Sequence, residues 1–289
     1  MFKSSDDKFI LSNGVEIPCI GYGTWQTPSG DVARTSVKAA LDAGYRHIDT
    51  AAAYGNEEDV GSGIIDSGVS RKEIFLTTKH WVTERGYEKT VAAIDESLKK
   101  LKTDYIDLYL IHWPCVEKIS PDWKEINAST WAGFEKAYKD GKIRALGVSN
   151  FLPEHLSALL ETAEIKPAVN QIEFHPGYYQ PENVRWCKEN GMIIEGWSPL
   201  GCGAVLNDPI INAIAGKYNV CAAQVCVRFA LQSGVLPLPK SVHADRIKFN
   251  KEVFGFELSA EDMTALMTLP PIGYSGFHPA QAPADALCE

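Results

Sequence analysis

The sequence of 289 residues lacks a long apolar run, a surplus of positive charge and a paired-cysteine motif. No run approaches the roughly 20 apolar residues of a membrane span, and the stretch around Lys3 and Asp6 lacks the apolar core of a signal peptide. The 28 Lys and Arg residues against 37 Asp and Glu residues give a net charge of −9, which repels phosphate backbones and anionic lipid headgroups. We therefore expect a cytoplasmic protein with no nucleic-acid partner and no membrane partner.

The cysteines also exclude two kinds of site. Seven cysteines are scattered along the chain, with no C-x-x-C pair and no zinc-like spacing beside histidines. Because cytosolic thiols stay reduced, we expect free, mostly buried thiols. The sequence predicts no disulfide framework and no metal site.

A dinucleotide-binding fingerprint and a domain linker are missing as well. The stretches 21–26 and 201–206 each begin with G-x-G but fail the last position of G-x-G-x-x-G, which disfavours a Rossmann domain. No Gly/Ser linker, charge block or low-complexity stretch divides the chain. We therefore expect one domain over residues 1–289.

Apolar β-type runs and helical patterns alternate eight times along this domain. Asn13-Gly14 between two short apolar runs predicts a β-hairpin ahead of the first unit, and Ser259 predicts the N-cap of an extra helix over 259–269. Eight unbroken βα units favour a (β/α)8 TIM barrel with an N-terminal hairpin and a C-terminal extra helix and tail. The expected units are 19–21 with 32–43, 47–48 with 57–67, 74–78 with 87–101, 106–111 with 129–140, 145–148 with 153–162, 168–170 with 181–190, 192–195 with 210–218 and 222–233, and 235–238 with 244–253.

Polar residues follow neighbouring apolar runs at the barrel end where chemistry is placed. Asp49 and Tyr54 follow the second run, Lys79 the third and His112 the fourth. A phenol has a pKa of about 10, and an ammonium such as that of Lys79 lowers it. Asp49 would hold Lys79 in place through a charge-assisted hydrogen bond, and His112 would donate to a bound carbonyl oxygen. Given a hydride source, the set predicts reduction or oxidation at a carbonyl or alcohol carbon.

The segments that carry these residues resemble the aldo-keto reductase superfamily in order and from end to end. They cover 44–57, 78–79, 105–114, 147–151, 170–176 and 238–241. The resemblance implies a catalytic tetrad of Asp49, Tyr54, Lys79 and His112, with Tyr54 as the general acid in reduction. It also implies a nicotinamide cofactor across the barrel mouth as the hydride donor.

The same resemblance implies where the cofactor binds. Ser149, Asn150 and Gln171 would hydrogen-bond the carboxamide, and Trp197 would stack on the nicotinamide where many members have Tyr. Lys240, Ser241 and Arg246 supply two cations and a hydroxyl that suit the 2′-phosphate of NADPH, so NADPH is the expected cofactor. Because Phe249-Asn250 stands where many members have a Glu, NADH stays open as a second one. The complete implied set is Ser149, Asn150, Gln171, Trp197, Ser198, Leu200, Lys240, Ser241, Arg246 and Asn250.

Aromatic residues near the same barrel mouth predict a substrate pocket. Trp25, Trp81 and Trp113 lie near the ends of the first four runs, and an apolar pocket with one polar corner suits aldehydes and activated ketones. The short stretch 201–208 predicts an open pocket. The resemblance is to bacterial 2,5-diketogluconate reductase-like members, which implies keto-sugar acids and methylglyoxal-like carbonyls as small-molecule substrates. We expect a monomer or a weak dimer.

Two other functions compete with a reductase. The alternative is a nucleotide-binding barrel with a redox-sensing or scaffold role and little turnover, which the complete tetrad disfavours. A metal-dependent hydrolase would need ligands that converge at the strand ends. His112 and His175 follow the fourth and sixth runs, but there is no His-x-His and no second carboxylate placed to bridge two metals.

Overall fold

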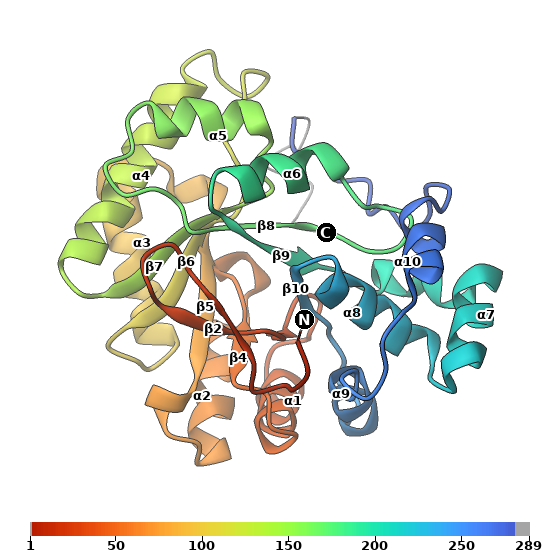
Figure 1. The fold of residues 1–289 in the computed structure, drawn as a ribbon. Helices are drawn as coiled ribbons and strands as arrows, with labels where there is room; N and C mark the ends of the chain where they lie inside the picture. Colours follow the sequence, from red (N-terminus) through yellow and green to blue (C-terminus); the bar gives the residue numbers. More distant parts are fainter. Residues whose placement is uncertain (1, 281–289) are drawn as a thin grey trace.

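The computed structural model describes residues 2–280 and shows a (β/α)8 barrel, as expected. Eight parallel strands form one nearly closed sheet, surrounded by helices (Figure 1). Along the sheet the order is sequential, from β3 to β10. The strands are β3 (Tyr22–Gly23), β4 (His47–Asp49), β5 (Phe75–His80), β6 (Ile106–Ile111), β7 (Ile143–Ser149), β8 (Val169–Glu173), β9 (Ile193–Trp197) and β10 (Val235–Leu238).

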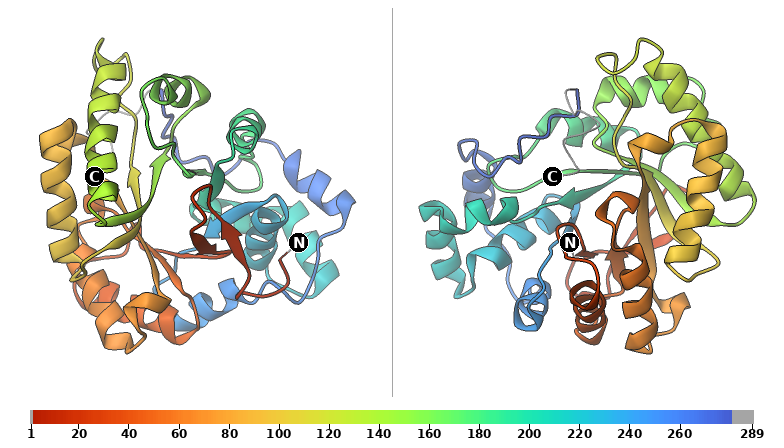
Figure 2. Two further views of the ribbon diagram at one scale, coloured as in Figure 1. Left: turned by 60° about the vertical axis from the view of Figure 1, so that its left-hand side comes forward. Right: turned by 180° about the vertical axis from the view of Figure 1, so that it is seen from behind.

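Helices cover the outside of this sheet, and the two turned views show them around the strands (Figure 2). Their inner faces are apolar and pack on the strands in one large buried cluster. The helices are α1 (Asp31–Asp42), α2 (Glu57–Ser67), α3 (Tyr87–Lys100), α4 (Trp123–Lys139), α5 (Pro153–Leu160), α6 (Pro181–Glu189), α7 (Pro209–Tyr218), α8 (Ala222–Gln232), α9 (Ala244–Lys251) and α10 (Ala260–Met267), with 3-10 turns η1 (Ala52–Tyr54), η2 (Arg71–Glu73), η3 (Val82–Glu84) and η4 (Gly201–Asn207).

Two glycines bring the first and last strands of the barrel together. The backbone N–H of Gly21 donates to Pro237 O and that of Gly23 to Pro239 O, both at 3.1 Å. A Cβ on Gly21 would lie 2.5 Å from a methyl carbon of Leu238, and one on Gly23 would lie 3.2 Å from the Leu238 carbonyl oxygen. Glycine at both positions therefore allows the close approach, because a side chain there would have to displace Leu238 or its backbone.

The predicted N-terminal hairpin is present as β1 (Lys8–Ile10) and β2 (Glu16–Pro18). Leu11 and Ile17 from this hairpin are buried in one apolar cluster with Phe75 and Ala168, which lie where β5 and β8 begin. The hairpin therefore covers the N-terminal end of the barrel and leaves the opposite end for the site. The Ser259 N-cap is also confirmed, since its hydroxyl accepts from Asp262 N at 3.2 Å.

Most predicted boundaries differ from the observed ones by one to three residues, and two of the differences have a clear physical reason. The first strand covers 22–23 instead of 19–21, because the backbone N–H of Cys19 donates to Asp7 O in the N-terminal segment. Helix α4 begins at Trp123 instead of 129. The apolar pattern of the first turns of α4 is interrupted by a buried polar residue, Asn127. Its side chain faces inward, where it accepts from the backbone N–H of Cys115 and donates to the Cys115 carbonyl.

Within residues 2–280, no single helix is long and apolar enough to cross a membrane, and α7 with α8 reach that composition only as a pair bent by 88°. The six cysteines in this part of the chain are free, and four of them are buried. Cys202 and Cys221 are exposed, and Cys288 lies outside the described residues.

Candidate active site

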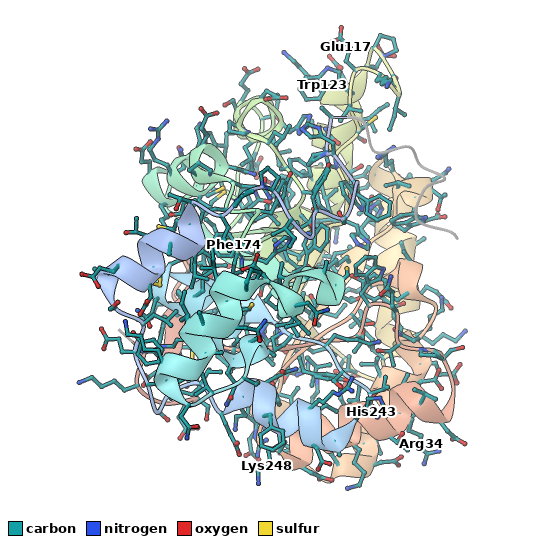
Figure 3. All side chains as sticks on the ribbon, turned by 90° about the vertical axis from the view of Figure 1, so that its right-hand side faces the viewer. Arg34, Glu117, Trp123, Phe174, His243 and Lys248 are labelled. Atoms are coloured by element: carbon teal, nitrogen blue, oxygen red, sulfur yellow. The ribbon has the colours of Figure 1, made fainter. Side chains whose placement is uncertain are left out.

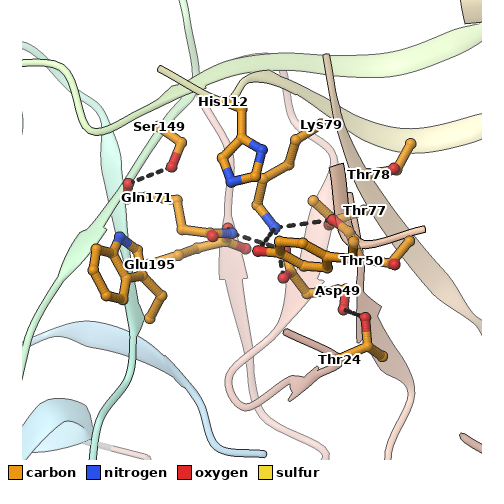
Figure 4. A network of polar contacts seen from close by, with 12 residues as sticks. Thr24, Asp49, Thr50, Thr77, Thr78, Lys79, His112, Ser149, Gln171 and Glu195 are labelled. Carbon is orange, nitrogen blue, oxygen red and sulfur yellow. Dashed lines mark hydrogen bonds and ion pairs between the residues drawn. The ribbon is translucent and has the colours of Figure 1, made fainter. Parts of the chain in front are cut away.

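Four side chains from the ends of three successive strands meet at the mouth of the barrel, and Figure 4 labels three of them, Asp49, Lys79 and His112. Lys79 Nζ, wholly buried on β5, donates to Asp49 Oδ1 at 2.7 Å and to the Thr50 carbonyl at 2.9 Å. It lies 3.2 Å from the Tyr54 hydroxyl oxygen. His112 follows β6, and its ring centroid is 5.5 Å from that of Tyr54. The structure thus brings together the whole tetrad that the sequence predicts.

The Tyr54 loop is held by one buried amide. Asn56 Oδ1 accepts from the Thr50 hydroxyl at 2.8 Å, and Asn56 Nδ2 donates to the carbonyls of Thr24 and Thr27 at 3.2 Å. These bonds join the loops after β3 and β4. They fix the short turn η1 that presents Tyr54 to Lys79.

Burial changes the expected electrostatics of Tyr54. The sequence predicts that Lys79 lowers the Tyr54 pKa, but burial raises it and the Lys79 ammonium only opposes the rise, so the Tyr54 pKa lies above its usual value. Burial lowers the pKa of Lys79 and the Asp49 carboxylate raises it, with the balance above the usual value. At neutral pH the phenol therefore keeps its proton beside a charged ammonium.

His112 is neutral in this setting. Burial, reinforced by the Lys79 charge, holds the His112 pKa well below its usual range. Its backbone carbonyl accepts from Asn150 Nδ2 at 3.0 Å, and Trp81 packs against its ring at 5.2 Å between centroids. A neutral imidazole donates one hydrogen bond without adding charge.

A cavity of about 500 Å³ extends from this cluster. Its wall includes most of the sequence-predicted site residues, while Lys79, Trp81, Ser241 and Asn250 lie outside the lining set. The predicted residues that line it are Trp25, Asp49, Tyr54, His112, Trp113, Ser149, Asn150, Gln171, Trp197, Ser198, Leu200, Lys240 and Arg246.

One side of the cavity is a preformed aromatic and amide wall. Trp197 Nε1 donates to Asn150 Oδ1 at 2.9 Å, and the Trp25 ring meets the Trp197 ring edge-on at 5.8 Å between centroids. The Ser149 hydroxyl donates to the Gln171 carbonyl at 2.9 Å. The Asn150 amide is thus committed to protein groups at both ends, and the Trp197 ring is fixed before any ligand arrives.

The far end of the cavity carries positive charge. Lys240 Nζ donates to Gln26 O at 2.8 Å, and exposed Arg246 forms no ion pair or hydrogen bond within residues 2–280. Ser241 lies beside them, and its hydroxyl accepts from His243 N at 3.1 Å. Asn250 is buried on α9, away from the cavity wall.

Several lining residues were not among the predicted site residues: Gly23, Gln26, Ala53, Pro199, Cys202, Gly203, Leu238 and Phe277. Gln26 and Cys202 line the cavity from left-handed backbone, with φ of 57° and 51°, a conformation that their residue types do not signal. Phe277 reaches the wall from the C-terminal segment and lies 6.4 Å from Trp113 between ring centroids. Trp123, at the start of α4 (Figure 3), packs on His155 instead of lining the cavity.

A buried carboxylate anchors the C-terminal segment that carries Phe277. Glu173, at the end of β8, accepts from Ser275 N at 2.9 Å and from the Ser275 hydroxyl at 2.7 Å. His175 Nε2 lies 3.2 Å from the same carboxylate. A Cβ on Gly273 would lie 3.3 Å from Gly201 Cα, so the segment is packed closely on the loop after β9.

We expect Ser275→Ala to loosen this segment. A hydrogen bond to a charged group is worth about 1.5–3 kcal/mol, so the free energy of unfolding should fall by about that amount in urea titrations. Ser157→Ala, at an exposed hydroxyl on α5, is the matched control. Equal stability of the two variants would contradict the anchor.

The part of the chain that the structure describes contains no candidate metal site. Among residues 2–280, no group of three or more His, Cys, Asp or Glu side chains is placed to hold a metal ion.

Comparisons with known proteins agree with this geometry. The model of the aldo/keto reductase family matches residues 19–269. A glyoxal reductase of Bacillus subtilis is 50% identical over 266 residues, which cover 92% of this chain and 94% of that protein.

Two solved structures have the same fold as this chain and share more than a third of its sequence. The aldo-keto reductase of Bombyx mori in complex with NADP has a TM-score of 0.84 and 35% identity, covering 92% of this chain and 93% of that one. The D53A mutant of Gox0644 in complex with NADPH has a TM-score of 0.89 and 39% identity, covering 97% and 100%. On the family match, the identity and the shared barrel together, the chain belongs to the aldo-keto reductase family, whose members are oxidoreductases that use a nicotinamide cofactor and act on small carbonyl compounds.

Proposed function

We propose that this protein reduces aldehydes and activated ketones to alcohols with NADPH. The observation that carries the proposal is the Tyr54 hydroxyl, which lies 3.2 Å from a buried ammonium at the base of an aromatic-walled cavity. The glyoxal reductase from Bacillus subtilis supports small reactive carbonyls as the substrate class. We extend this class to keto-sugar acids and methylglyoxal-like carbonyls, because the cavity combines aromatic walls with polar groups at Tyr54 and His112.

The residues at the cavity base divide the chemistry between them. Bound NADPH supplies the hydride that the carbonyl carbon accepts. Tyr54 gives its proton to the carbonyl oxygen, and neutral His112 donates a hydrogen bond to the same oxygen. The Lys79 ammonium stabilises the phenolate that remains, and Asp49 holds Lys79 in place. Each group is set before the reaction, so little reorganisation is needed as charge develops.

The residues along the cavity fit a nicotinamide dinucleotide. The fixed Trp197 ring offers a face for the nicotinamide, and Gln171 offers a polar atom for the carboxamide. At the far end Arg246 is unpaired within residues 2–280 and Lys240 bonds only a carbonyl there. Two cations without a carboxylate partner suit the 2′-phosphate that NADPH has and NADH lacks.

We expect Arg246→Ala to weaken NADPH binding about 10- to 100-fold, because one charge-assisted hydrogen bond is worth about 1.5–3 kcal/mol. The NADH affinity should hardly change, since NADH has no 2′-phosphate. Calorimetric titration of both cofactors measures the two effects. Lys248→Ala is the control, because Lys248 projects outward from the same helix (Figure 3) and lies 3.8 Å from Glu252. An equal loss for NADPH and NADH would contradict the phosphate contact.

A panel of carbonyls tests the substrate class. Glyoxal, methylglyoxal, 2,5-diketogluconate and an aromatic aldehyde are assayed with NADPH and NADH in parallel, following loss of the reduced cofactor. We expect turnover on several of these carbonyls and a higher kcat/KM with NADPH. Tight NADPH binding without turnover on any of them would instead favour the nucleotide-sensing alternative.

A further inference from the structure

A second carboxyl group lies buried behind the tetrad and takes no part in the steps above. Glu195, on β9, is fully buried, and its Oε2 accepts from Gln171 Nε2 at 2.8 Å. The same Gln171 nitrogen donates to Asp49 Oδ2, also at 2.8 Å. Figure 4 shows Gln171 between the two carboxyl groups. Gln171 thus links Glu195 to the tetrad.

This arrangement determines which way the Gln171 amide faces. A side-chain amide has two donor hydrogens on nitrogen and one acceptor oxygen. Both hydrogens have carboxyl partners, so the nitrogen is turned into the barrel. Flipping the amide would set its oxygen against the Asp49 carboxylate, which would keep only Lys79 as a donor, and would leave Glu195 without its Gln171 donor. The side-chain oxygen of Gln171, Oε1, has no hydrogen-bond donor within residues 2–280, whereas its backbone carbonyl accepts from Ser149. Oε1 is therefore the end of the amide presented to the cavity that Gln171 lines.

The charges around Glu195 leave it without a cation of its own. On β5, Lys79 bonds Asp49 and makes no hydrogen bond to Glu195. His47 on β4 lies 3.7 Å from Glu195 Oε1, but burial lowers the His47 pKa to about 3 and keeps it neutral. On β10 the residue in register with Glu195 is the apolar Leu236.

Two carboxyl groups therefore share one ammonium and one amide. Burial, with the nearby Asp49 charge, raises the pKa of Glu195 to about 8. At pH 7 Glu195 keeps its proton, and the buried cluster carries one ammonium and one carboxylate.

We propose that Glu195 is a positioning residue of the cofactor site. Glu195 turns the side-chain oxygen of Gln171 toward the carboxamide N–H₂ of the cofactor. In its protonated form, Glu195 also keeps a second negative charge away from the nicotinamide. This inference rests on the proposed use of NADPH. Its consequence concerns oxidised cofactor, because the nicotinamide ring is cationic in NADP⁺ and neutral in NADPH. An ionised Glu195 would attract only the cationic ring, so its proton at neutral pH favours release of NADP⁺.

The sign of the pH effect follows directly. As pH rises from 7 to 9, Glu195 ionises, and the affinity for NADP⁺ rises while that for NADPH does not. The ratio of the two Kd values isolates this effect. Lys240 at the far end, and the cofactor's own phosphates, are common to both complexes, so their titration largely cancels in the ratio.

Two variants test the proposal through binding alone, with Kd values for NADP⁺ and NADPH measured from tryptophan fluorescence quenching between pH 6.5 and 9. Glu195→Gln keeps an acceptor oxygen for Gln171 but cannot ionise. It should bind both cofactors at pH 7 as the wild type does, and its Kd ratio should not change with pH. Glu195→Leu removes the acceptor and should weaken both cofactors by about 10-fold at every pH. Thermal unfolding confirms that each variant is folded.

The results separate this inference from the proposed function. Wild-type-like binding by folded Glu195→Leu would overturn the orienting role. A wild-type ratio that is flat with pH, or a Glu195→Gln ratio that keeps the wild-type slope, would overturn the charge role. Failure of NADPH to bind the wild type would overturn the proposed function and this inference with it.

Discussion

Tyr54→Phe lowers kcat for aldehyde reduction by about 10²- to 10⁴-fold, the usual contribution of general acid catalysis. The substitution removes only the hydroxyl that lies 3.2 Å from Lys79 Nζ and keeps the ring that packs beside His112. The Kd for NADPH should stay within a few-fold of the wild-type value. Steady-state kinetics and a binding titration on the same preparation measure both quantities.

The control for this variant is Tyr87→Phe, which removes an exposed phenol on α3 and should leave kcat unchanged. If Tyr54→Phe retained turnover within a few-fold of the wild type, Tyr54 could not be the acid. A matching loss of NADPH affinity would show that the hydroxyl serves binding instead.

Lys79→Met affects stability and activity together. Lys79 is wholly buried and forms an ion pair with Asp49. Its removal therefore leaves a buried carboxylate without its cation. Breaking one partner of a buried pair costs about 3–5 kcal/mol, and the free energy of unfolding should fall by that amount. Turnover should fall by about 10²-fold or more, because the phenolate of Tyr54 loses its neighbouring charge.

A double variant separates the two effects. Lys79→Met with Asp49→Asn removes the orphaned charge, so part of the lost stability should return while activity stays low. Denaturant unfolding and steady-state kinetics on the single and double variants decide the point. A single variant as stable as the wild type, or a double variant that recovers turnover, would contradict the assigned roles.

Local patterns were sufficient to predict most elements of the barrel. The structure confirms helix α2 over Glu57–Ser67 and strand β6 over Ile106–Ile111 at the expected residues, because their apolar patterns lie within the segments themselves. Strand β3 begins later than predicted because Cys19, in the apolar run, bonds the N-terminal segment through its backbone N–H instead of joining the sheet. The start of α4 was missed because Asn127, a polar residue, occupies a buried position there.

The same distinction separates what could be predicted of the site from what could not. The order of strand ends brings Asp49, Lys79 and His112 together in any barrel of this kind, so their cluster followed from the sequence. The rise of the Tyr54 pKa could not be predicted from the sequence, because it results from burial of the hydroxyl. Glu195 was read only as part of a buried strand, since its contact with Gln171 appears only in three dimensions.

The central claim is that a hydride passes from NADPH to a carbonyl carbon in this cavity. NADPH that carries deuterium in place of the transferred hydrogen at C4 of the nicotinamide, incubated with glyoxal and the wild-type protein in ordinary water, tests it most directly by mass spectrometry of the product. We predict one deuterium on the former carbonyl carbon for each cofactor oxidised. An alcohol product without deuterium, or cofactor that binds and is never consumed by any carbonyl of the panel, would contradict the account.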